Sequence, residues 1–194
     1  FYLDDAKIKQ WNIEPEFLKP VIKSPKEADA ILIDPAKLKF KIFMCNKSKE
    51  ELRQENKLGA LKYIEWGERQ GYDKRPTCAS RSPEPWYSLG KNWLYAPLIF
   101  PAKVGERLPV FLNDNIFEDK KLYGITPKNP EDTSILAALL NSTLSRFFIE
   151  FTCRQLTGAQ AIADIDVVVV ESLPVFNIDR IPENIKRKLT EKFN

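Results

Sequence analysis

The sequence predicts an α+β domain in which helices pack on a twisted mixed sheet. Short runs of β-branched and aromatic residues, bounded by proline and aspartate, are typical of strands. Longer segments repeat apolar residues at spacings of three and four, as helices do. The chain has 194 residues, of which 43% are hydrophobic, and this suits one domain or one domain with a small lobe.

The first part of the chain carries both kinds of element. We expect strands at residues 31–33 and 40–44, joined by a turn near Asp34-Pro35, and helices at 48–55 and 58–70, the second ending at Gly71. Residues 1–61 are therefore interpreted as the N-terminal part of the domain, with strands and a helix. Residues 62–194 form the remainder of the same domain.

The second part begins with an irregular stretch, because Pro76, Pro83 and Pro85 interrupt helical periodicity between residues 72 and 93. Strands are expected at 95–102, 108–112, 120–125 and 165–170, and a short final helix at 185–193. The strongest signal is a core helix over 132–151, with one broad apolar face that includes Leu140 and Phe147.

Several classes of chemistry lack their usual residues. The sequence has no histidine, and its three cysteines are widely separated, which argues against a zinc site and against His-based catalysis. No Gly-x-Gly occurs, so no phosphate loop is expected. Asp119-Lys120-Lys121 has the Asp-x-Lys spacing of some metal-dependent nucleases, but an aspartate next to two lysines is usually a solvated turn, so nuclease chemistry is not expected. No apolar run approaches about 20 residues, so we expect no membrane span, and the unclustered cysteines favour the cytoplasm.

Positive charge concentrates in the middle of the chain. Residues 62–107 hold eight basic and five acidic side chains, whereas residues 130–170 hold two basic and five acidic. Within 69–107, cations alternate with Tyr72, Trp86, Tyr87 and Trp93, a mixture that suits nucleic-acid binding. The alternative is that these aromatic residues belong to the core and that the cations form a solvated rim.

The segment 69–107 is therefore the predicted DNA-facing surface. Lysines are expected to contact phosphates, and arginines to bond base edges unless they pair with Glu68, Asp73 or Glu84. A loop around residue 158 is a second candidate. The predicted DNA-binding residues are Arg69, Lys74, Arg75, Arg81, Lys91, Asn92, Lys103, Arg107, Arg154, Gln155, Thr157 and Gln160.

Four groups of short motifs follow one another along the chain. They are Leu18–Ile22; Leu61–Glu65 with Arg75–Arg81 and Trp86–Leu89; Ala138–Leu144; and Leu156–Ala159 with Leu173–Val175. In order and spacing, the chain resembles the C-terminal target-recognition (specificity) domain of Taq-type N6-adenine DNA methyltransferases and related restriction–modification enzymes. It departs from that pattern at Gly158-Ala159, where the family often has two glycines.

The resemblance implies a domain that recognises a DNA sequence for an N-terminal methyltransferase domain of the same parent chain. Its partner is double-stranded DNA, and S-adenosylmethionine belongs to the catalytic domain, with or without a fused endonuclease. No two prolines are adjacent here, so the Pro-Pro motif of the catalytic half is missing, and the start at Phe1 suits a segment of a longer protein. We expect this segment to bind no cofactor and no metal and to catalyse nothing. The alternative is a protein–protein docking module of a restriction–modification complex.

Overall fold

The computed structural model describes residues 1–90, 94–105, 109–156 and 162–193, apart from the side chains of residues 154–156 and 192. The chain forms two compact units. The first contains residues 1–21 and 38–94, and the second contains residues 22–37 and 95–194. The helix that includes residue 61 lies entirely within the first unit. The α+β class predicted from the sequence is confirmed, with the strands divided among several small sheets.

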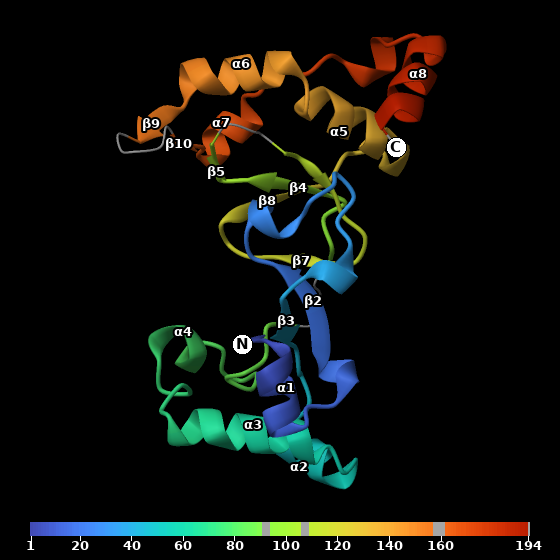
Figure 1. Cartoon of the computed structure of the whole chain (residues 1–194). Coiled ribbons are helices and arrows are strands. Elements are labelled where there is room, and N and C mark those ends of the chain that lie inside the picture. Colours follow the sequence, from blue (N-terminus) through green and yellow to red (C-terminus); the bar gives the residue numbers. More distant parts are fainter. Residues whose placement is uncertain (91–93, 106–108, 157–161, 194) are drawn as a thin grey trace. The chain divides into compact units, whose positions relative to one another are not determined.

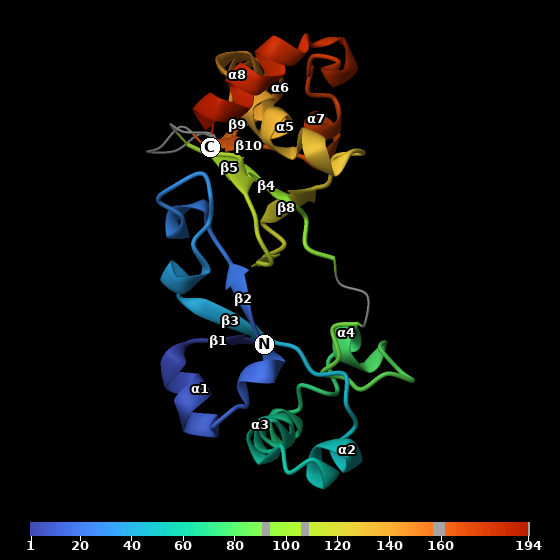
Figure 2. The same ribbon diagram turned by 90° about the vertical axis from the view of Figure 1, so that its right-hand side faces the viewer.

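The first unit combines a small antiparallel sheet with helices. Its strands are β1 (Tyr2–Leu3), β2 (Leu18–Ile22) and β3 (Phe40–Phe43), in the order β1-β3-β2. Its helices are α1 (Asp5–Trp11), α2 (Lys49–Gln54), α3 (Leu58–Arg69) and the short α4 (Pro76–Ala79). Figures 1 and 2 show α1 and α3 lying near one another beside this sheet. The core includes Phe17, Phe43, Leu52 and Ile64.

A distant carboxylate caps the start of α3. Lys57, the residue before the helix, provides no side-chain cap. Glu14 does so instead, because its two carboxylate oxygens accept from the amides of Gly59 and Ala60 at 3.0 and 2.9 Å. Free amides and the positive end of the helix dipole both favour a negative charge at this position. Gly59 allows the approach, since a Cβ there would lie 1.9 Å from the carbonyl oxygen of Asn12.

The second unit holds two small antiparallel sheets. One has the order β6-β4-β8, formed by β4 (Leu98–Pro101), β6 (Phe111–Leu112) and β8 (Leu122–Ile125). The other has the order β5-β10-β9, formed by β5 (Lys103–Val104), β9 (Arg154–Leu156) and β10 (Ile162–Asp164). The short strand β7 (Phe117–Glu118) precedes β8. Helices α5 (Thr133–Leu140), α6 (Thr143–Thr152), α7 (Val167–Glu171) and α8 (Glu183–Phe193) gather on one side of β4 and β8 (Figures 1 and 2).

The single core helix expected over 132–151 is wrong. The segment forms α5 and α6, which meet at an angle of 65°. Ser142 starts the second helix by accepting from the amide of Ser145 at 3.3 Å. The bend rotates the apolar stripe. Leu140 is buried, whereas Phe147 and Phe151 are 57% and 75% exposed, contrary to the expectation for Phe147.

Asn141 occupies the bend as a structural hydrogen-bonding residue. Its side-chain oxygen accepts from the Val110 amide at 2.9 Å. Its side-chain nitrogen donates to the carbonyl oxygens of Val110 at 2.8 Å and Ala137 at 2.9 Å. One amide therefore satisfies both backbone groups of a fully buried residue and joins the helix pair to the start of β6.

Replacing Asn141 with alanine is expected to lower the free energy of unfolding by about 1–3 kcal/mol, because the buried amide and carbonyl of Val110 are left without a partner. Urea denaturation measures the change. Asn184→Ala, at an exposed position of α8, is the matched control and should leave stability within about 0.5 kcal/mol of the unaltered chain. Equal effects of the two substitutions would contradict the role given to Asn141.

Three other expectations differ from the structure. The segment 31–33 does not pair with 40–44, because these two segments lie in different units. Instead, Leu32 forms an isolated parallel bridge with Leu112 of its own unit. The strand expected at 165–170 is mostly helix α7, although four consecutive valines favour a strand locally. Pro76 opens a short helix rather than preventing one, since proline needs no amide partner in the first turn.

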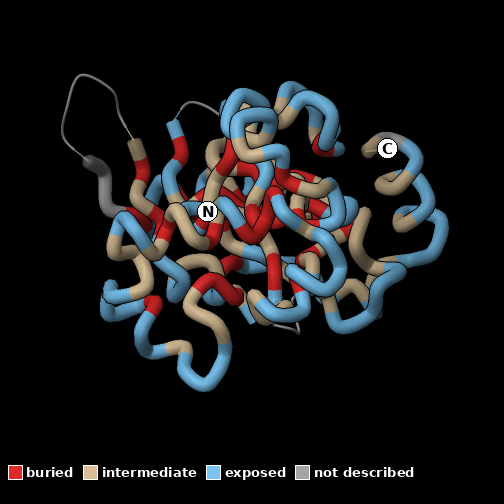
Figure 3. The backbone as a smooth tube through the Cα atoms, turned by 90° about the horizontal axis from the view of Figure 1, so that it is seen from below, coloured by how far each residue is buried: buried red, intermediate tan, exposed pale blue. Residues whose placement is uncertain are grey.

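The C-terminal segment is mostly at the surface. From residue 174 to residue 193 the described side chains are exposed or half-buried (Figure 3). Among the described residues, no single helix is long and apolar enough to cross a membrane. The bent pair Pro130–Leu140 and Thr143–Thr152 reaches the required length and composition only when the two helices are taken together.

Candidate nucleic-acid interface

The loop that follows α3 carries the predicted arginines of the first unit. Gly71 ends the helix in the left-handed region, with φ of 72°, which glycine adopts without strain. Tyr87 anchors the far side of the loop. It is only 3% exposed, and its hydroxyl donates to the carbonyl of Lys47 at 2.8 Å. The core role suggested for Tyr87 is therefore confirmed, and burial raises the pKa of its phenol.

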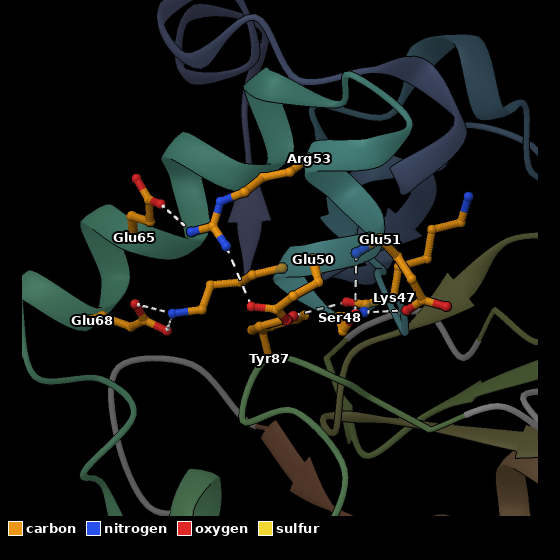
Figure 4. A network of polar contacts seen from close by, with 9 residues as sticks. Lys47, Ser48, Glu50, Glu51, Arg53, Glu65, Glu68 and Tyr87 are labelled. Atoms are coloured by element: carbon orange, nitrogen blue, oxygen red, sulfur yellow. Dashed lines mark hydrogen bonds and ion pairs between the residues drawn. The ribbon is translucent and has the colours of Figure 1, made fainter.

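A polar network holds α2, α3 and this loop together (Figure 4). Arg53 contacts Glu50 at 3.3 Å and Glu65 at 3.4 Å. Lys49 lies 3.0 Å from Glu68, which also accepts from the indole nitrogen of Trp86 at 3.3 Å. Glu68 is thus paired with Lys49 and not with Arg69.

Arg75 is the arginine of this loop that is best placed for a ligand. Its side chain is exposed, and its guanidinium lies 4.4 Å from the ring centre of Tyr72. In the described part of the chain no ion pair joins it to Asp73. Stacking on an aromatic face leaves the guanidinium donors at the edge available for an acceptor pair.

Arg81 has a structural contact instead. It is half-buried, its Nη1 donates to the carbonyl of Trp86 at 2.6 Å, and its guanidinium lies 5.5 Å from the ring centre of Phe1. Arg69 and Lys74 are exposed on the same unit as Arg75. A cavity of about 250 Å³ lies in this unit, lined by aromatic rings and by Arg75.

The structure distributes the other predicted residues differently. Lys103 lies on β5 of the second unit, exposed and 3.9 Å from Asp164. Lys91, Asn92, Arg107, Thr157 and Gln160 lie outside the described residues, as do the side chains of Arg154 and Gln155.

Three lysines of the second unit were missed by sequence reasoning. A groove in the second unit is lined by Lys103 and also by Lys23, Lys26 and Lys121. Two features of the sequence pointed to these lysines: Lys23 and Lys26 are three residues apart, and Lys121 belongs to the Asp-x-Lys motif. Both are weak, because nothing in the sequence shows that residues near 25 and near 120 lie together.

Groups for catalysis are sparse in the described part of the chain. There, no three His, Cys, Asp or Glu residues gather closely enough to hold a metal ion. Burial raises the pKa of the Cys45 thiol to about 11, so this sulfur stays protonated and weakly nucleophilic at neutral pH.

Comparison of the sequence with protein families and with curated proteins finds no match. The fold does resemble that of a solved structure. The structure is similar to the type IIG restriction endonuclease BpuSI, with a TM-score of 0.65 and 11% identity. The similarity covers 97% of this chain and 22% of that protein. At this identity the likeness concerns the fold, and the chain corresponds to about a fifth of the restriction endonuclease.

Proposed function

We propose that this chain recognises a DNA target sequence for an adenine-specific DNA methyltransferase of a restriction–modification system. The main support is that the fold of nearly the whole chain resembles one part of a type IIG restriction endonuclease. The order of short motifs in the sequence is independent support. On this proposal the methyl donor, S-adenosylmethionine, binds a separate catalytic domain, and double-stranded DNA binds here.

The proposed division of labour follows the chemistry of the side chains. Arg75, stacked on Tyr72, is the main candidate for a base contact, since guanidinium can pair with both acceptors of a guanine. Arg69 is the second candidate. Lys74 and Lys103 are proposed to contact phosphates, where a mobile point charge suffices. Arg81 is proposed to act mainly by fixing the loop through the Trp86 carbonyl.

The test is selection of DNA from a randomised duplex pool by the 194-residue chain, followed by binding measurements on the enriched sequence. We expect enrichment of a defined motif. Arg75→Ala should reduce the preference for that motif over unrelated DNA by about 1–3 kcal/mol, whereas Lys74→Ala should weaken binding to all sequences alike.

Arg187→Ala is the matched control, because Arg187 is exposed on α8 and the substitution removes the same charge. The Arg187→Ala chain should prefer the enriched motif over unrelated DNA as strongly as the unaltered chain does. Salt-dependent binding without any enriched motif would contradict sequence recognition. An unchanged preference in Arg75→Ala would remove that residue from the proposed base contacts.

One observation favours the alternative, a docking module within a restriction–modification complex. Helix α6 exposes an apolar stripe of Leu144, Phe147 and Phe151, and the last two rings lie 4.5 Å apart. Docking through this stripe predicts a protein complex whose affinity changes little with salt, since apolar contacts are not screened. DNA binding predicts the opposite, because counterions are released from phosphates.

A further inference from the structure

A groove lies in the second unit. Its volume is about 760 Å³, and it is lined by residues of the segment 23–31, of strands β5, β6 and β10, and of the turn before β8. All of the lining residues belong to the same compact unit. The groove is therefore a feature of that unit alone.

Two backbone hydrogen bonds bring its walls together. The amide of Asp119 donates to the carbonyl of Ile22 at 2.9 Å, which places Lys23 beside the turn that carries Lys121. The amide of Ala102 donates to the carbonyl of Lys121 at 3.0 Å, which places Lys103 beside the same turn. Lysines from three distant parts of the sequence thus surround one space.

The charge of the groove is strongly positive. Its charged lining residues are Lys23, Lys26, Lys103, Lys121 and Asp29. Asp29 accepts from Lys37 at 2.7 Å, and this contact lowers the pKa of its carboxyl group and offsets its charge. Lys103 lies 3.9 Å from Asp164, both near the surface, and such a contact is readily exchanged for another anion.

The rest of the lining provides little for base recognition. Phe111, Pro109, Ile31 and Ile162 are apolar. Asn141 also lines the groove, but its amide is already bonded to Val110 and Ala137. Lysine charges beside an apolar wall suit the phosphates and the sugars of a nucleic-acid strand, which carry no sequence information.

We propose that this groove holds the sugar–phosphate backbone of DNA and supplies sequence-independent affinity. The inference rests on the proposed function and adds a site outside the basic segment 69–107, apart from Lys103. It assigns phosphate contacts to Lys23, Lys26 and Lys121 together with Lys103, and leaves base contacts to the arginine-bearing loop of the first unit. A volume of about 760 Å³ with lysines from three segments leaves room for more than one phosphate.

The test is the salt dependence of binding to a labelled duplex of mixed sequence, followed by fluorescence anisotropy between about 50 and 200 mM salt. The groove variant is Lys23→Gln/Lys26→Gln/Lys121→Gln. The matched variant is Lys128→Gln/Arg180→Gln/Lys188→Gln, which removes three exposed charges of the same unit outside the groove. Thermal unfolding of each variant confirms that the fold is kept.

Affinity falls as salt rises, and we expect the groove variant to make this fall less steep: the magnitude of the slope of log affinity against log salt should decrease by about three, because each substituted lysine no longer neutralises a phosphate. Its preference among DNA sequences should be unchanged. The matched variant should lower the slope by less than about one. Equal slopes for the two variants would overturn the groove site, while salt-dependent binding by the unaltered chain would still support DNA recognition.

Two other results separate the proposals. If the unaltered chain binds no duplex at low salt, the proposed function and the DNA occupant of the groove both fail. Titration with poly-glutamate tests a different occupant. If the groove variant no longer binds poly-glutamate but keeps the full DNA slope, the groove holds an acidic peptide and our assignment is wrong.

Discussion

Replacing Leu140 with alanine is expected to lower the free energy of unfolding by about 2–5 kcal/mol, because it leaves a cavity that its neighbours fill only in part. Leu140 ends α5 and is 4% exposed. It belongs to a core cluster that includes Leu98, Val110 and Ile149. The melting temperature should fall by roughly 4–20 °C for a chain of this length.

The matched control is Leu144→Ala. Leu144 lies four residues further on, in α6, and is 49% exposed, so the same truncation should cost less than about 1 kcal/mol. Thermal unfolding followed by circular dichroism compares the two. A Leu140→Ala melting temperature equal to that of Leu144→Ala would show that α5 does not contribute to the core.

Adding a single methyl group at Gly59 is expected to cost about 3 kcal/mol or more through steric overlap. The Cβ of an alanine would lie 1.9 Å from the carbonyl oxygen and 2.6 Å from the carbonyl carbon of Asn12. Both atoms belong to the backbone, so α3 must move away from the end of α1. That movement also weakens the two hydrogen bonds that the amides of Gly59 and Ala60 donate to the Glu14 carboxylate. The higher helix propensity of alanine returns only about 1 kcal/mol.

Gly67→Ala is an instructive comparison within the same helix. Its Cβ would meet the ring of Trp86 at 2.6 Å, but a side chain can shift where a backbone cannot. Gly105→Ala meets no other atom within 4 Å and serves as the neutral control. Urea denaturation should rank the decreases in stability as Gly59→Ala, then Gly67→Ala, then Gly105→Ala. A Gly59→Ala chain as stable as Gly105→Ala would contradict the close approach.

Local patterns predicted the elements whose signals are complete within a few residues. The helices at 48–55 and 58–70 are present as α2 and α3, and Ser48 forms a capping box with Glu51. The end of α3 shortly before Gly71 was also predicted, and the structure supplies the reason, since only a flexible residue adopts the φ of Gly71 cheaply. The place of Tyr87 in the core was one of the two interpretations that the sequence left open.

Other elements depended on contacts that no local pattern contains. The valines at 167–170 form a helix despite their strand propensity, because packing of Val169 and Val170 against the core overrides an intrinsic preference of this size. The bend at Asn141 is stabilised by Val110, more than thirty residues earlier in the chain. Apolar spacing continues across the bend, and so periodicity alone predicted one continuous helix.

The sequence by itself determined the α+β class, the absence of histidine chemistry, and a basic region with aromatic residues. Only the tertiary structure decided which cations share a surface. Lys23, Lys103 and Lys121 surround one groove because one backbone hydrogen bond joins Ile22 to Asp119, about 100 residues apart in sequence, and a second joins Ala102 to Lys121, about 20 residues apart. Arg81 lies in the predicted basic segment, yet it bonds a backbone carbonyl. Charge along a sequence adds up locally, whereas a binding surface depends on the spatial neighbours that long-range backbone pairing creates.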